Sequence, residues 1–367
     1  MKLFFALSIF FLVLTNSWGQ SPSEKAVSTI PMASPSPELN TTDVSTFKNN
    51  KNYWKQLTKT DATNQAVWVS YFDAAKFSNY DKHSRFLDKT EMEELEGIRQ
   101  QVSAIIPNTY AHYYIEYQVL GKTKSGFSFL EKAYQLNPDV TLLDDMLAKA
   151  IIERNDVKKK EFIKKLYESG TISAALLEYN QNVLYSIEEN GNLVTYGYAD
   201  TYPLYILQEL FEIRRDVRIV CLEWLVNEDY NTSWSNRLGY PNKLHTKENV
   251  QLAQILNKHA SMPIYVGLTL PPNLLAASKD NLYCTGLALK YSPTPIGHLT
   301  SLKSNWETLF KKKQIEIDED INANYLLPLL MLEKMYISEG GNKTVRPLID
   351  KLAKKYAPSI NIQKQLK

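Results

Sequence analysis

The second half of the chain alternates between strand-like and helix-like segments, and this alternation constrains the fold more than any other feature. Short apolar runs typical of β-strands are separated by segments with helical periodicity. The runs are Asn192–Tyr198, Val217–Leu225, Met262–Leu270 and Asn281–Tyr291. Strands joined through helices favour parallel pairing, with the helices packed on the sheet. The sequence therefore predicts a small, mostly parallel α/β sheet domain over residues 186–300, closed by C-terminal helices over residues 301–367.

The first half has helical periodicity alone, so the predicted fold class is α + α/β. Amphipathic segments follow one another between residues 50 and 185, and Pro107 and Pro138 end two of them. These prolines lie roughly 31 residues apart, close to the ~34-residue period of tetratricopeptide repeats. The segment "FLEKAYQLNPD" resembles the second helix and turn of such a repeat, with Ala133 at the small position. We therefore expect N-terminal tetratricopeptide-like helical repeats over residues 50–185, with a small helical bundle as the alternative.

A stack of such repeats has a concave face that commonly holds a peptide or a protein. Trp68 and Tyr71 match the W-x2-Y start of a repeat. Tyrosine is common in the chain, with 23 residues, and its ring buries area while its hydroxyl stays hydrated. Tyr113, Tyr114 and Tyr117 are therefore candidate binding residues of the repeats. The alternative is that tyrosines fill half-buried helix positions.

The N-terminus has the pattern of a secretory signal over residues 1–19. Lys2 precedes an apolar run from Leu3 to Leu14, and small residues stand just before Gln20. The run is too short for a comfortable membrane span. Residues 20–49 are rich in Ser, Pro and Thr and predict a disordered leader. The mature chain is therefore expected to be exported without a transmembrane segment, to the periplasm or the periplasmic face of the outer membrane, or alternatively secreted.

Charge and motif content narrow the function classes. The formal net charge is +2, which gives no reason to expect nucleic acid as a partner. The histidines lack metal-ligand spacing and no nucleotide or hydrolase motif is present, so no cofactor and no metal are expected. Cys221 and Cys284 lie in strand-like runs. On neighbouring strands they could form a disulfide, and otherwise they are buried free thiols.

Asp200 follows the first predicted strand, where parallel sheets bind their ligands. Asp200 and Thr201 stand shortly before Pro203, a pattern that also starts helices, so the acid either caps the following helix or serves a ligand site. Glu223, near the end of the second strand, could line the same crevice. Asp200 and Glu223 are thus the candidates for catalysis, and Asp200 and Thr201 are candidates for binding. Tyr196 and Tyr198 add stacking and hydrogen-bonding surface to that binding set.

The stretch around Asp200 resembles a signature in a family from the Bacteroidota. That family has a loop reading roughly N-G-D-N-D-T-Y-P-L-W, followed by "LQE" and "R-x-D-V"; this chain keeps Thr201–Leu204, Leu207–Glu209 and Arg214–Val220. The family includes secreted repeat proteins and the soluble C-terminal part of membrane proteins whose N-terminal half resembles protein O-mannosyltransferases. In place of other polar residues of the family loop, this chain has Tyr196, Tyr198 and Ala199. One remaining carboxylate cannot hold a hard cation alone, which favours binding over catalysis.

Two functions from different classes follow from these patterns. The first is an exported adaptor or scaffold, a subunit of a cell-envelope assembly for protein secretion or outer-membrane protein biogenesis. Its partners would be envelope proteins, with an integral outer-membrane protein complex among the candidates. The second is a periplasmic enzyme or ligand-binding protein that acts on glycan or glycoprotein at the crevice around Asp200.

Overall fold

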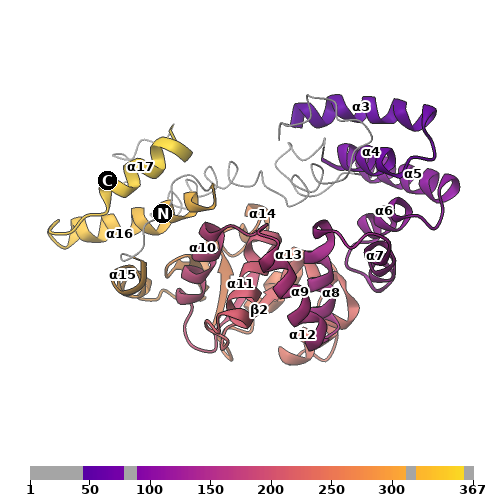
Figure 1. Cartoon of the computed structure of the whole chain (residues 1–367). Coiled ribbons are helices and arrows are strands. Elements are labelled where there is room, and N and C mark those ends of the chain that lie inside the picture. The colour runs from indigo at the N-terminus through magenta and orange to yellow at the C-terminus, as the bar shows by residue number, and fades with distance from the viewer. Residues whose placement is uncertain (1–43, 78–88, 311–319, 359–367) are drawn as a thin grey trace. The chain divides into compact units, whose positions relative to one another are not determined.

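The computed structural model describes residues 44–77, 89–310 and 320–358 (Figure 1). These residues form many helices and one five-stranded sheet. The chain divides into two compact units. The helical unit holds the described residues up to Phe162, together with Val226–Glu228, and the sheet unit holds the remainder from Ile163 onward. Within the described residues, no helix is long and apolar enough to cross a membrane.

The helical unit is a succession of helices that pack on their chain neighbours. They are α3 (Val44–Thr60), α4 (Gln65–Phe77), α5 (Lys89–Ile105), α6 (Tyr110–Leu120), α7 (Lys124–Leu136), a 3₁₀ turn (Val140–Leu142), α8 (Leu143–Ile152) and the start of α9 (Asp156–Glu168). Helix α4 also packs against α6. Trp68, Phe72, Ile115 and Leu130 are among the fully buried side chains that join these helices. The predicted helices of this region are confirmed, whereas the tetratricopeptide type of repeat stays a prediction.

Local capping explains where these helices start and end. Thr109 accepts a hydrogen bond from the backbone N–H of His112 at 3.3 Å, and Thr123 accepts one from Gly126 at 3.1 Å, so α6 and α7 have side-chain caps. Helix α3 starts at Val44, although residues up to 49 were predicted to belong to a disordered leader. Those last leader residues contain neither Pro nor Gly, so the helix that carries buried Trp54 extends into them. The predicted signal segment and the rest of the leader lie outside the described residues.

The sheet unit alternates helices and strands. In chain order it contains α10 (Ala174–Tyr185), β1 (Asn192–Thr195), α11 (Tyr198–Leu210), β2 (Arg218–Cys221), α12 (Glu228–Arg237), α13 (Glu248–Leu256), β3 (Ile264–Gly267), α14 (Pro272–Leu275), β4 (Leu282–Cys284), β5 (Ala288–Tyr291), α15 (His298–Asn305), α16 (Leu326–Ser338) and α17 (Arg346–Tyr356). Short 3₁₀ or π-helical turns cover Leu222–Val226, Lys279–Asn281, Trp306–Phe310 and Asp320–Tyr325. Helix α10 packs on α11 and belongs to the sheet unit, which starts before residue 185, the predicted end of the helical repeats.

The sheet is mixed, with strand order β2-β1-β3-β5-β4. Strand β1 pairs in parallel with β2 and β3, while β5 pairs antiparallel with β3 and β4. The prediction of a mostly parallel sheet with a single strand over Asn281–Tyr291 was therefore wrong. That run folds back on itself as the hairpin β4–β5 through a turn over residues 285–287, in which Gly286 adopts a φ of 157° that suits glycine.

Helices are predicted for the C-terminal region, and its helices α16 and α17 lie side by side as a hairpin (Figure 1). Gly340 and Gly341 both have positive φ and make the turn. The buried carboxylate of Glu333 accepts hydrogen bonds from the Thr344 hydroxyl at 2.8 Å and from the Val345 N–H at 2.7 Å. These bonds fix the start of α17.

Candidate functional site

The loops after β1 and β3 leave the sheet in opposite directions. From β1 the chain passes through α11 to β2 on one side, whereas from β3 it continues to the hairpin β4–β5 on the other side. Because β1 and β3 are neighbouring parallel strands, their carboxyl ends form a topological switch point. In open α/β sheets this is the place where ligands bind. The short connection to α11, whose first turn carries Asp200, starts at this point.

Asp200 joins the first turn of α11 to the loop after β3. It is 6% exposed and its Oδ2 accepts a hydrogen bond from the hydroxyl of Thr269, two residues after β3. Asp200 also lies in the first turn of α11, where a negative charge suits the helix dipole. The helix begins at Tyr198 after Gly197, whose φ is 81°, so the prediction that Asp200 and Thr201 precede and cap this helix was wrong. The glycine starts the helix earlier than a β-branched or bulky residue would allow.

Asn180 supplies the hydrogen bond that Pro203, inside α11, cannot make. Proline has no N–H to donate to the carbonyl four residues before it, which here belongs to Ala199. The Asn180 side-chain amide donates to this oxygen at 2.9 Å from the neighbouring helix α10. The same amide donates to the Leu176 carbonyl at 2.9 Å. Asn180 is therefore a structural substitute for the missing backbone donor.

Glu223 and Tyr196 also hold this end of the sheet. Glu223 Oε2 accepts a hydrogen bond from the Gly197 N–H at 2.7 Å, which fixes the residue that starts α11. Tyr196 is buried, and its hydroxyl donates to the two carboxylate oxygens of Glu248 at 3.3 and 3.4 Å. The structure therefore brings the predicted acids Asp200 and Glu223 to the same end of the sheet.

Tyr198 and Thr201 complete the predicted set around Asp200. The Tyr198 hydroxyl lies 3.2 Å from that of Thr171, and its ring contacts Tyr202. Thr201 is fully buried, with its hydroxyl 2.9 Å from Thr195 Oγ1 and 3.6 Å from Cys221 Sγ. With no exposed surface, Thr201 serves the packing between β1, α11 and β2. Tyr198, which is half-buried, is the more accessible of the two.

The signature residues after Asp200 stabilise the β1–α11–β2 connection. Arg214 donates to the carbonyls of Leu184 at 2.9 Å and Ile187 at 2.7 Å, and it forms a two-bond ion pair with Asp216, with both distances 2.8 Å. This pairing lowers the pKa of Asp216 to about 2. Gln208 donates to the carbonyls of Arg214 and Val217 at 2.8 and 2.7 Å. The side chains of the kept "LQE" and "RRDV" segments thus bond to the backbone carbonyls at the end of α10 and in the loop before β2.

The two cysteines lie on strands at opposite edges of the sheet. Cys221 ends β2 and Cys284 ends β4, and three strands separate these two. Four strand spacings amount to about 19 Å, far beyond the reach of a disulfide. Both thiols are free and buried, and burial raises the pKa of Cys284 to about 12. The possible disulfide was therefore wrong, and the alternative of two buried thiols is confirmed.

The three tyrosines proposed for the repeat face do not share one surface. Tyr114 and Tyr117 are buried, and the Tyr114 hydroxyl donates to Asp73 Oδ1 at 3.0 Å. Burial also raises the pKa of Tyr114 and Tyr117 well above the ordinary value. Tyr113 alone is half-buried, because adjacent residues of a helix point in different directions. The prediction of a shared binding role for Tyr114 and Tyr117 was wrong, since both serve the helical core.

Buried acids accompany these tyrosines in the helical unit. Desolvation by burial raises the pKa of Asp73 to about 7, although Lys76 and the Tyr114 hydroxyl act in the opposite direction. Lys76 donates to Gln118 Oε1 at 2.7 Å, and burial lowers its pKa. Lys122 forms an ion pair with Asp145 at 2.7 Å. These groups link α4, α6 and α8 through polar contacts inside the helical unit.

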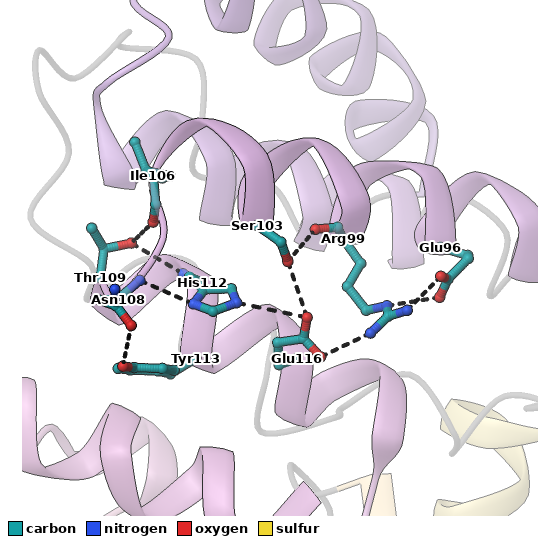
Figure 2. A network of polar contacts seen from close by, with 9 residues as sticks. All are labelled: Glu96, Arg99, Ser103, Ile106, Asn108, Thr109, His112, Tyr113 and Glu116. Atoms are coloured by element: carbon teal, nitrogen blue, oxygen red, sulfur yellow. Dashed lines mark hydrogen bonds and ion pairs between the residues drawn. The ribbon is translucent and has the colours of Figure 1, made fainter.

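A second polar network joins α5 to α6 (Figure 2). The buried carboxylate of Glu116 receives Arg99 Nη1 at 2.9 Å and the Ser103 hydroxyl at 3.0 Å. His112 Nδ1 accepts from the Asn108 N–H at 3.1 Å, so in the neutral ring Nε2 carries the proton; it lies 3.7 Å from Glu116. Burial lowers the pKa of His112. The network fixes the ring of His112, whose centre lies 5.0 Å from that of Tyr113.

Several of these groups could not be identified from the sequence. Asn180, Thr269 and Glu248 reach the site from distant parts of the chain, and no local motif marks them. The sequence indicates Asn180 only indirectly, since Pro203 within a helical pattern leaves the carbonyl four residues before it in need of another donor. Among the described residues there is no group of three or more His, Cys, Asp or Glu side chains that could hold a metal ion.

Comparison with protein families gives one partial match. The family model described as TMEM260-associated domain 2 matches residues 176–240. This segment runs from α10 past the end of α12 and includes Asn180, Asp200 and Arg214. The match is compatible with the resemblance to the soluble part of membrane proteins similar to O-mannosyltransferases. No curated protein and no solved structure gives a significant match.

Proposed function

We propose that the chain is an exported adaptor that binds protein partners through its helical unit. The observation that carries this proposal is the succession of helices α4 to α8, in which each packs on its neighbours and α4 also meets α6. Such stacks present one continuous face to solvent and commonly bind polypeptides. The sheet unit would then serve as a rigid second module.

The contacts at the switch point support a structural role for its acids. The carboxylate of Asp200 is engaged by Thr269, and that of Glu223 is engaged by the Gly197 N–H. Asn180 and Arg214 donate to the flanking backbone carbonyls of Ala199 and Leu184. Side chains committed to such bonds fix the ends of strands and helices, and breaking a buried bond of this kind costs roughly 1–3 kcal/mol.

The predicted secretory signal supports the cell envelope as the compartment of the proposed adaptor. We propose partners among the proteins of an envelope assembly, such as one for protein secretion or outer-membrane protein biogenesis. An integral outer-membrane protein complex is the partner that a periplasmic subunit would meet.

A pull-down from native envelope tests this proposal. The chain is tagged at its C-terminus, the envelope is solubilised in mild detergent, and co-purifying proteins are quantified. We expect a partner at stoichiometric level that survives washing. A chain that elutes alone across mild detergents and salt concentrations would contradict the adaptor function.

The second candidate is a ligand-binding protein or enzyme that acts on glycan or glycoprotein at the crevice. One observation favours it: Asp200 bonds to the loop after β3, and Glu223 lies at the same end of the sheet, where α/β sheets bind ligands. Under this function, Asp200→Asn would abolish glycan binding or turnover while the circular dichroism spectrum stays unchanged. Under the adaptor function, the same substitution leaves partner capture intact.

A further inference from the structure

The outer side of α6 and α7 carries a cation resting on an aromatic pair. The rings of Tyr113 and Phe129 lie 6.1 Å apart, and Lys132 Nζ lies 5.2 Å from the first ring centre and 5.5 Å from the second. Both rings are half-buried and Lys132 is exposed. Leu136, one turn after Lys132, is 55% exposed and lies on the same face of α7. We name Tyr113, Phe129, Lys132 and Leu136 the α6–α7 surface.

The base of this surface is held by the network that joins α5 to α6. His112 contacts both Tyr113 at 5.0 Å and Phe129 at 6.1 Å between ring centres. Its ring is fixed by the Asn108 N–H on one side and faces Glu116 on the other (Figure 2). The Tyr113 hydroxyl donates to Asn108 Oδ1 at 2.9 Å. Aromatic side chains held in this way lose little conformational freedom when they bind.

The charge of Lys132 has no carboxylate partner among the described residues. Its neighbour Glu131 pairs instead with Lys149 at 2.9 Å, and Glu116 is engaged by Arg99 and Ser103. An exposed ammonium over two rings attracts a carboxylate, while the rings and Leu136 attract an apolar side chain. The surface is therefore complementary to a segment that places an acid beside an aromatic or aliphatic residue.

We propose that the α6–α7 surface binds an acidic peptide segment of a partner protein, with a partner carboxylate on Lys132 and an apolar side chain against Phe129 and Leu136. This inference rests on the proposed adaptor function and specifies its contact. Phe129 is the anchor, and Lys132 sets the charge preference.

The test uses the full chain and labelled peptides. The probe is a fluorescein-labelled peptide that alternates glutamate with leucine and phenylalanine, and two matched peptides carry glutamine or lysine in place of glutamate. Fluorescence anisotropy should show that the wild-type chain prefers the glutamate peptide over the lysine peptide by at least about tenfold. Phe129→Ala should weaken this binding by about tenfold or more.

Reversing the charge at position 132 is the decisive part of this experiment. Lys132→Glu lies at an exposed position and should reverse the preference, so that the lysine peptide binds more tightly than the glutamate peptide. Lys124→Glu, on the exposed first turn of the same helix, makes the same change in net charge and should leave the preference unchanged. Phe211→Ala, at a 45% exposed aromatic of the sheet unit, is the matched control for Phe129→Ala.

The outcomes separate this inference from the function on which it rests. Equal binding of the three peptides by the wild-type chain, or a Lys132→Glu variant that keeps the wild-type preference, overturns the α6–α7 surface as the contact. If Lys132→Glu and Phe129→Ala still capture the envelope partner as the wild type does, the adaptor function stands and the surface is wrong. If the wild type captures no partner, the adaptor function itself fails.

Discussion

The hydrogen bond from Asn180 to the Ala199 carbonyl should be energetically coupled to Pro203. In the wild-type chain this carbonyl has no N–H four residues later, because position 203 is proline, and the 2.9 Å bond from Asn180 takes its place. Asn180→Ala removes that donor at a site only 1% exposed. An unsatisfied acceptor costs roughly 1–3 kcal/mol, so we expect a loss of this size in the sheet unit.

In a chain that carries Pro203→Ala, the substitution Asn180→Ala should cost less stability. Alanine at position 203 supplies the missing N–H to the Ala199 carbonyl, so Asn180→Ala should cost about 1 kcal/mol less there than in the wild-type chain. Hydrogen exchange of peptides over residues 198–221 measures the free energy of opening, and 1 kcal/mol corresponds to about a fivefold change in rate. If the two substitutions are additive within about 0.3 kcal/mol, Asn180 does not replace the proline N–H.

Three further predictions concern single groups. Glu116→Gln should raise hydrogen-exchange rates of α5 and α6 by roughly tenfold or more, because Arg99 or Ser103 loses its acceptor, whereas the exposed Glu93→Gln should not. Asp73 holds its proton in the fold up to pH about 7 but loses it near pH 3.8 when unfolded, so its contribution to stability declines as pH rises between these values. In that window the free energy of opening of α4 should fall with rising pH by up to about 1.4 kcal/mol per pH unit more in the wild type than in the Asp73→Asn variant. The same pH dependence in both chains would refute this. Both Cys221 and Cys284 should resist a thiol reagent in the native chain and react after denaturation without reductant, whereas two unreactive thiols in denaturant would indicate a disulfide.

The helices and the parallel strands could be predicted because their apolar periodicity is local. Trp68 and Phe72 mark one buried helix face, and β1 is buried along its whole length. The hairpin β4–β5 was missed because its two strands form one apolar run around Gly286. The apolar residues indicate that the run is a buried strand, but they do not show that the chain turns at Gly286.

The sequence predicts that Asp200 and Glu223 lie at one end of the sheet, but it does not show which groups bond to them. Asp200 and Glu223 do lie at the same end of the sheet, as expected from the ends of neighbouring strands. Thr269 and Asn180 come from remote elements, and their bonds exist only once the sheet has formed. Tyr114 and Tyr117 were assigned to a surface because the sequence does not show which face of a helix is covered.

The most direct test of the adaptor account compares partner capture by three forms of the full chain. Wild type, Asp200→Asn and the double variant Phe129→Ala, Lys132→Glu are expressed in the native envelope, and the co-purified partner is quantified for each. The account predicts that Asp200→Asn captures as much partner as the wild type, while the double variant loses at least about nine-tenths of it. Loss of the partner with Asp200→Asn and retention with the double variant would contradict the account and would assign binding to the crevice of the sheet unit.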